Sequence, residues 1–212
     1  MPNGDLPYLL GRVRDLTRRY RAGQPESFDA FSELVLLILG QTVLAPHGGV
    51  SLVYLSRTRE KAVIGGRAGP EDPLPLRDKR FLRLSITLQL VPTPEGHRLK
   101  VFESSYQYQI DPQGERWIFR YDYLRHPPRP HPAAHFQIRG SLTEPDCLPL
   151  RTPLERVHFP THRVSLEAVI RLLADQFRVP CQEPPESWHP VLDESERYFL
   201  AIAHPPVAEA AP

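Results

Sequence analysis

The sequence is poor in cysteine and in long apolar runs, and each shortage excludes a class of protein. Its two cysteines, Cys147 and Cys181, stand in no metal-binding spacing. They predict free thiols in a reducing compartment rather than a disulfide-stapled secreted fold. The longest apolar run, Leu34 to Leu39, is far shorter than the roughly 20 residues that cross a bilayer. Because the N-terminal segment also lacks the apolar stretch of a signal peptide, we expect a cytoplasmic protein with no membrane partner.

Sequence motifs of the common enzyme classes are also absent. The chain contains no GxSxG, no P-loop, no GxGxxG and no HExxH, so it lacks their nucleophile, phosphate, dinucleotide and zinc sites. A net charge of +1 with 24% charged residues excludes a bulk attraction to nucleic acid or membrane. Lysine is scarce, with 3 Lys against 23 Arg. We read this skew as typical of a GC-rich bacterial genome, and we expect no cofactor.

Proline, by contrast, is abundant. The chain has 25 prolines among 212 residues, more than twice the roughly 5% of average proteins. Because proline lacks a backbone donor and fixes φ, it collects in turns and connections. The sequence therefore predicts long irregular loops between its regular elements, and above all a loop over residues 59–80, with one short strand near Ala62 to Ile64.

The N-terminal part predicts two helices. In residues 6–21 the apolar side chains recur with the 3.6-residue period of an amphipathic helix, and five arginines share the rest of its surface. Gly23 and Pro25 end this helix. Residues 28–39 follow as a second helix that is apolar enough to be buried.

The middle of the chain predicts an antiparallel sheet. Residues 81–91 alternate strictly between apolar and polar side chains, as a strand with one buried face does. The strand predicted over 98–110 changes phase near Val101 and Phe102, which indicates a bulge. Strands over 115–124 and 133–141 complete this part of the sheet, and the first of them places Trp117 on the same face as Phe119.

The order of elements is typical of an α+β fold. We expect a single domain over residues 1–204 with an antiparallel meander of about five strands. Its parts are N-terminal helices in 1–45, the sheet in 50–141 and C-terminal helices in 164–204. Ser165 caps the first C-terminal helix, Asp193 begins the last, and residues 205–212 form a disordered tail.

Five of the nine histidines gather in one stretch of the chain: His126, His131, His135, His158 and His162. Two of their spacings, 131 to 135 and 158 to 162, would bring two imidazoles to one metal on a helix. Prolines within and beside these pairs forbid a helix, and on an extended strand the pair would be about 13 Å apart. We therefore predict no metal site, and a metal-dependent hydrolase is the least favoured function.

A polar strand face is the first candidate for a functional site. His135, Gln137 and Arg139 alternate with apolar residues, and on the strand before them Arg120 and Asp122 do the same. Together they would present groups that bind an anion or phosphate, with His135 and Asp122 in acid–base catalysis. The alternative is an ordinary wet face of an antiparallel sheet.

The loop over residues 156–163 is the second candidate. It places Arg156, His158, His162 and Arg163 just before a helix N-terminus, where backbone donors and the helix dipole favour anions. These residues would bind phosphate. A structural alternative is equally open, in which His162 or Thr161 caps the turn and Arg163 pairs with Glu167.

From Tyr106 onward the chain resembles the TumE-type toxins of bacterial toxin–antitoxin modules and related prokaryotic families of unknown function. The resemblance covers residues 104–178. It is carried by a Tyr106-x-Tyr108 strand, a turn, the run Arg120-Tyr121-Asp122, a histidine-bearing loop and strand, and a segment His158-Phe159-Pro160 that leads into an amphipathic helix.

This resemblance implies a toxin or defence protein that acts on or binds RNA or DNA and has a cognate protein partner such as an antitoxin. In a metal-free cleavage, His135 would act as general acid or base while Arg139 and Arg163 hold phosphate. The second hypothesis is a non-enzymatic interaction module, favoured by the near-zero net charge and the prolines. The sequence does not specify an oligomeric state.

Overall fold

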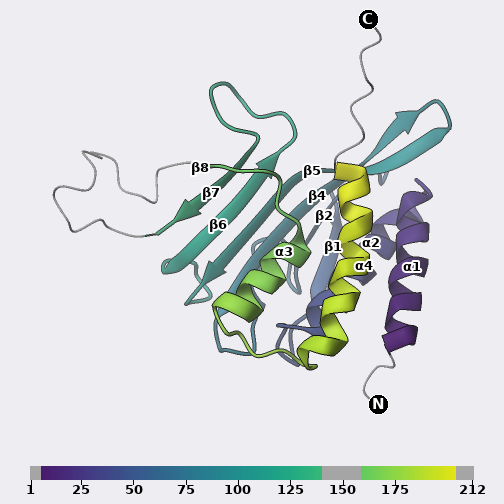
Figure 1. Cartoon of the computed structure of the whole chain (residues 1–212). Coiled ribbons are helices and arrows are strands. Elements are labelled where there is room, and N and C mark those ends of the chain that lie inside the picture. Colours follow the sequence, from purple (N-terminus) through teal and green to yellow (C-terminus); the bar gives the residue numbers. More distant parts are fainter. Residues whose placement is uncertain (1–5, 140–158, 204–212) are drawn as a thin grey trace, which may run out of the picture.

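The computed structural model describes residues 6–139 and 159–203, which form an antiparallel sheet with helices packed on one face (Figure 1). The sheet has eight strands: β1 (Val50–Tyr54), β2 (Lys61–Gly66), β3 (Leu74–Pro75), β4 (Phe81–Thr93), β5 (Gly96–Gln109), β6 (Trp117–Leu124), β7 (Ala134–Ile138) and β8 (Phe159–Pro160). They lie in the order β1-β2-β4-β5-β6-β7-β8, and β3 pairs with β4. The predicted α+β class with an antiparallel meander is confirmed.

The helices come from the two ends of the chain and pack together. They are α1 (Leu6–Arg21), α2 (Glu26–Gln41), α3 (Leu166–Arg171), which continues as a π-helical turn over Leu172–Gln176, and α4 (Pro185–Ala203). The first predicted helix agrees with α1 at both ends. Ser165 caps α3 as predicted, because its hydroxyl accepts a hydrogen bond from the Ala168 amide at 3.0 Å.

Strand alternation determines which face of the sheet the helices cover. Leu82, Leu84, Ile86 and Leu88 of β4 are at most 2% exposed, and they lie on the same face as Tyr106 and Tyr108 of β5 through direct cross-strand pairs. Apolar side chains of α1, α2, α3 and α4 complete this core. The other face of the central strands carries their polar residues.

Two irregularities in pairing set the phase of the strands. Between Thr87 and Leu88 of β4 the register skips Phe102, which confirms the predicted bulge. A second skip, at Ile118 of β6, places Trp117 opposite Gln109. The predicted aromatic face is therefore wrong at one position: the Arg120 guanidinium carbon lies 6.0 Å from the Trp117 ring centroid, so Trp117 shares the polar face.

The sheet contains more strands than the about five predicted, because part of the predicted loop over 59–80 is regular. Residues 61–66 form a full strand, β2, which is buried nearly throughout and pairs on both sides. Such a strand shows no alternation that a sequence pattern could reveal. The short β3 is paired at the edge of the same region.

The last helix also begins earlier than predicted. It begins at Pro185, a residue type suited to the first helical turn, and it continues through Pro190. Asp193 therefore lies inside α4 and forms an ion pair with Arg171 at 2.6 Å instead of capping the helix.

Candidate functional site

Polar side chains form two rows across the face of the sheet that the helices leave uncovered. Strand pairing places Asp122 of β6 between Ser105 of β5 and His135 of β7. One step along the same strands, Arg120 lies between Gln107 and Gln137. Because residues two apart share a face, the two rows are adjacent. The structure thus brings together four of the predicted site residues: Asp122, His135, Arg120 and Gln137.

Asp122 is the centre of this cluster. Its Oδ2 atom accepts a hydrogen bond from Arg120 Nε at 2.7 Å and lies 3.3 Å from His135 Nε2. The Arg120 guanidinium also donates to the Gln137 side-chain oxygen. A carboxylate in this position orients the imidazole, and the guanidinium is held by two partners.

The members of this cluster differ in how far they are exposed to solvent. His135 and Gln137 are 3% and 4% exposed, whereas the Arg120 side chain is 36% exposed. The ring of His131, from the loop between β6 and β7, contacts the buried ring of His135 edge-on with centroids 4.6 Å apart.

A hollow of about 240 Å³ opens beside these groups. It is lined by Ser85, Glu103, Ser104, Ser105, Arg120, Asp122, Tyr123, Leu124, His131 and His135. Residues with imidazole, carboxylate, guanidinium and hydroxyl groups therefore border one space, and two of them, Glu103 and Asp122, are acidic. The combination can move a proton beside a substrate that the guanidinium binds.

Sequence reasoning did not place His131 in the site. The prediction assumed an extended chain between His131 and His135, which would separate them. Instead the loop turns back, with the His131 amide donating to the Pro128 carbonyl at 2.7 Å. The prolines of this loop were the available signal, since they favour tight turns.

Two other predicted residues lie away from the hollow. The Arg139 guanidinium donates to the backbone carbonyl of Glu115, and the Arg139 amide bonds to Ile118 at 3.0 Å, beyond the far end of β7. His162 is exposed and lies beside Tyr121 and Tyr123, whose side chains belong to the helix-covered side. Neither residue lines the hollow.

Arg163 lies on the opposite side of the sheet from His135. Its guanidinium carbon is 4.4 Å from the Tyr123 ring centroid and 4.6 Å from that of Phe199 on α4. Burial lowers the pKa of Arg163. Arg163 and the polar face therefore do not form one site as predicted, because the sheet separates Arg163 from Asp122. Arg156 and His158 lie outside the described residues.

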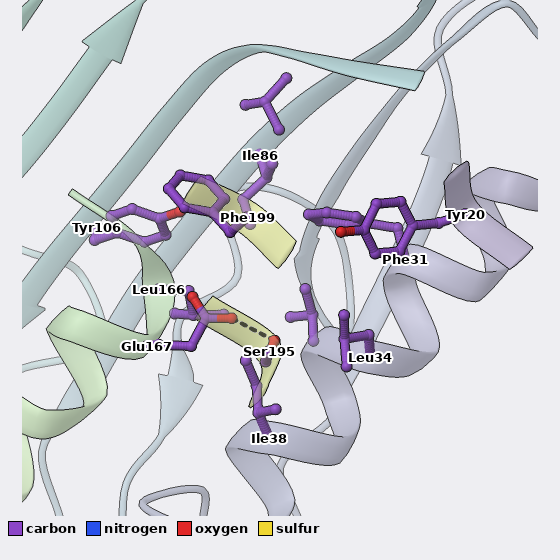
Figure 2. A pocket seen from close by; sticks show the side chains of 12 residues that line it. Tyr20, Phe31, Leu34, Ile38, Ile86, Tyr106, Leu166, Glu167, Ser195 and Phe199 are labelled. Atoms are coloured by element: carbon purple, nitrogen blue, oxygen red, sulfur yellow. Dashed lines mark hydrogen bonds between the residues drawn. The ribbon is translucent and has the colours of Figure 1, made fainter. Parts of the chain in front are cut away.

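A small cavity with a buried carboxyl lies under the helices. Figure 2 shows Glu167 of α3 pointing into a space between the helices and the sheet, where the Ser195 hydroxyl of α4 donates to it. Burial raises the pKa of Glu167, although the Ser195 hydrogen bond acts in the opposite direction. The cavity of about 30 Å³ has room for water and is otherwise lined mainly by apolar and aromatic side chains. The predicted Arg163–Glu167 pair is not formed.

Within residues 6–139 and 159–203, no three His, Cys, Asp or Glu side chains group so that they could hold a metal ion. In the same described part of the chain, no helix combines the length and apolarity that a membrane span requires.

Comparison with known protein families identifies the family to which this chain belongs. The family described as toxin TumE matches residues 52–177, more than half of the 212 residues. The chain belongs to the TumE toxin family. The match begins well before residue 104, where the resemblance in the sequence starts, and it contains Asp122, His135 and every strand from β2 to β8. No curated protein and no solved structure matches this sequence.

Proposed function

We propose that this TumE-family protein is a toxin that acts on nucleic acid in the hollow of its polar face. In this proposal Arg120 binds a backbone phosphate, while His135, oriented by Asp122, transfers a proton in a metal-free cleavage. The observation that carries the proposal is the contact of His135 with Asp122 at 3.3 Å beside the Arg120 guanidinium.

The arrangement suits a phosphodiester better than an uncharged substrate. Arg120 is held at Nε by Asp122 and still has a side chain 36% exposed toward solvent, so part of its guanidinium can meet an anion. The imidazole that Asp122 orients can transfer a proton to or from a reacting oxygen. In this proposal Arg120 is the phosphate ligand, the role that the sequence-based hypothesis gave to Arg139 and Arg163.

His131 is the second histidine of the hollow. It is less buried than His135, its ring contacts the His135 ring, and both residues line the hollow. In the proposal it meets the substrate first and exchanges protons with His135, so that the two rings and Asp122 act as one acid–base unit.

The test is the toxicity and nuclease activity of variants at this cluster. We expect His135→Gln and Asp122→Asn to lower the rate of RNA or DNA cleavage by about 100-fold or more, the range of general acid–base catalysis. Growth inhibition upon induced expression should fall with it. Arg120→Gln should weaken oligonucleotide binding and reduce its salt dependence by about one phosphate contact.

His126→Ala is the matched control, because His126 belongs to the same β6–β7 loop but is exposed, contacts the Phe102 ring at a tilt and does not line the hollow. It should retain full toxicity. Circular dichroism and the denaturation midpoint check that each variant is folded. If folded His135→Gln and Asp122→Asn proteins are as toxic as the parent, the site assignment is wrong, and a binding module without catalysis becomes the better reading.

A further inference from the structure

An indole stands on the polar face of the sheet, next to the proposed phosphate ligand. Trp117 lies opposite Gln109, whereas Phe119 lies opposite Tyr108 in the core, so the skipped residue Ile118 reverses the direction of the indole. Without this bulge, alternation along β6 would place Trp117 beside Phe119 under the helices. Bulges that redirect a side chain are frequent next to active sites. Here the bulge moves a large apolar ring out of the core and onto a face of polar side chains.

The two tryptophans of the chain differ in how their rings are covered. Trp188 of α4 is 2% exposed and stacks on His189, with ring centroids 3.9 Å apart. Trp117 is half-buried, and within the described residues no aromatic ring contacts it. The Arg120 guanidinium carbon lies 6.0 Å from its centroid, which is the outer limit of a cation–π contact. Part of Trp117 is therefore open to a flat group from solvent.

Arg120 lies between Trp117 and the hollow, and two of its nitrogens are engaged. Nε donates to Asp122 at 2.7 Å, and Nη2 donates to Gln137. In the described part of the chain Nη1 has no such partner, and the side chain is 36% exposed. Trp117, Arg120 and Asp122 occupy successive positions on this face of β6, about 7 Å apart. Because one sugar separates the base and the phosphate of a nucleotide, this spacing suits a base on the indole and a phosphate on Nη1.

We propose that Trp117 is a stacking platform for a nucleobase whose phosphate binds Arg120, and that the substrate is single-stranded nucleic acid. This assignment rests on the proposed function and deepens it, because it names the substrate class of the same hollow. Bases within a duplex stack on one another, whereas those of a single strand can present a face to an aromatic side chain. Every base has such a face, so RNA and DNA strands of any sequence share this chemistry.

Stacking supplies affinity that the charge of this face does not. The hollow is lined by the acidic Glu103 and Asp122 as well as by Arg120, and the net charge of the chain is only +1. The attraction to phosphates is therefore weaker than in a basic nucleic-acid-binding protein. A single stacked base strengthens binding by roughly 5- to 150-fold. An indole on the polar face thus decides whether a strand stays bound near His135.

The experiment is a titration of the full-length protein, followed by tryptophan emission, with four probes at one ionic strength. Two probes are single strands, the octamers of uridylate and of thymidylate. The third is a DNA octamer in which every nucleotide is abasic, so that it carries the same phosphates without bases. The fourth is a blunt, GC-rich DNA duplex. Repeating the titration with His135→Gln keeps the strands intact if the parent cleaves them.

We expect both octamers to quench the emission saturably, and the abasic strand and the duplex to leave it unchanged. Trp117→Phe keeps a ring and leaves Trp188 as the sole tryptophan. Its affinity for a labelled octamer, measured by fluorescence anisotropy, should therefore stay close to that of the parent while the quenching disappears. Trp117→Leu should weaken binding at least about fivefold.

Tyr8→Leu is the control, because Tyr8 is 63% exposed on α1, away from the polar face. Its octamer affinity should equal that of the parent. Circular dichroism and the denaturation midpoint check that each variant is folded. A purely structural role of Trp117 would leave the emission unchanged by any strand, so the quenching separates stacking from packing.

The proposal is overturned if neither octamer quenches the emission, if the abasic strand or the duplex quenches it equally, or if folded Trp117→Leu binds as tightly as the parent. Quenching by one octamer alone supports the single-strand assignment and selects RNA or DNA. Cleavage is measured separately. Quenching without His135-dependent cleavage would refute the proposed cleavage alone, and His135-dependent cleavage without quenching would refute only the role of Trp117.

Discussion

At the scale of single residues, burial changes the pKa of a side chain that its position in a helix would otherwise leave in solvent. Glu167 stands in the first turn of α3, where a carboxylate is ordinarily solvated and favoured by the helix dipole. Here it points into the helix–sheet cavity, and burial raises its pKa above the ordinary value of 4.5. Its partner is the Ser195 hydroxyl, and the pairing with Arg163 that was one of the two alternatives from sequence is not formed.

The raised pKa of Glu167 predicts a loss of stability as pH rises. The folded protein holds this proton more tightly than the unfolded chain does. The stabilisation is therefore fully present below pH 4.5 and is lost as pH rises through the folded-state pKa. Glu167→Gln keeps an acceptor for Ser195 but cannot ionise. We expect its free energy of unfolding, measured by urea denaturation between mildly acidic and neutral pH, to fall less than that of the parent.

The exposed Glu95 of the β4–β5 turn provides the matched variant. Glu95→Gln should follow the parent's profile of stability against pH. Parallel profiles for the parent and Glu167→Gln would contradict the prediction.

At the scale of elements, the β4–β5 hairpin projects beyond the rest of the sheet as a two-stranded arm (Figure 1). The turn between α1 and α2 approaches this arm closely. A Cβ atom added to Gly23 would lie 1.7 Å from the backbone oxygen of His97, and the φ of Gly23 is +69°. Only glycine fits both requirements, because other residues are strained at positive φ and carry a Cβ.

A pair of glycine substitutions tests this contact. Gly23→Ala should lower the free energy of unfolding by at least about 1–2 kcal/mol, the cost of a left-handed residue without the added clash. Gly11→Ala, inside α1 with no atom within 4 Å of the new Cβ, should raise it by roughly 0.5–1 kcal/mol. Chemical denaturation measures both. An unchanged or more stable Gly23→Ala protein would show that the turn does not rest on the hairpin as described.

At the scale of the whole molecule, one sheet separates two polar environments. The cluster of Asp122 and His135 lies on the face without helices, and Arg163 lies among the helices on the other face. Alternation alone produces this division, because Asp122 and Tyr123 are consecutive residues of β6 and point to opposite sides.

The separation predicts that variants of the two faces act independently. His135→Gln should lower the rate of cleavage without changing how stability depends on pH, and Glu167→Gln should do the opposite. In the combined variant both effects should add within about 0.5 kcal/mol, as they do for distant sites without shared partners. Cleavage rates and free energies of unfolding measured on all the variants check this. A larger interaction energy would mean that the two faces are coupled through the sheet.

Much of the architecture was predictable because it depends on local periodicity. The alternation in residues 81–91 correctly placed Leu82 and Leu84 in the core, and the phase change at Phe102 correctly indicated a bulge. Ser165 and the two ends of α1 followed from capping and stop signals. The doubly buried β2 was incompletely predicted, since a strand without a wet face has no alternation to read.

The sequence by itself determined that His135 and Gln137 share a strand face with one orientation, and that Arg120 and Asp122 do so on the strand before. Alternation is a property of the backbone and needs no tertiary contact. Only the tertiary structure decided that these four side chains meet, that the loop brings His131 against His135, and that Arg163 lies across the sheet from them. Those outcomes depend on strand register, on the path of a proline-rich loop and on where α4 packs. All three are set by contacts between residues far apart in the chain.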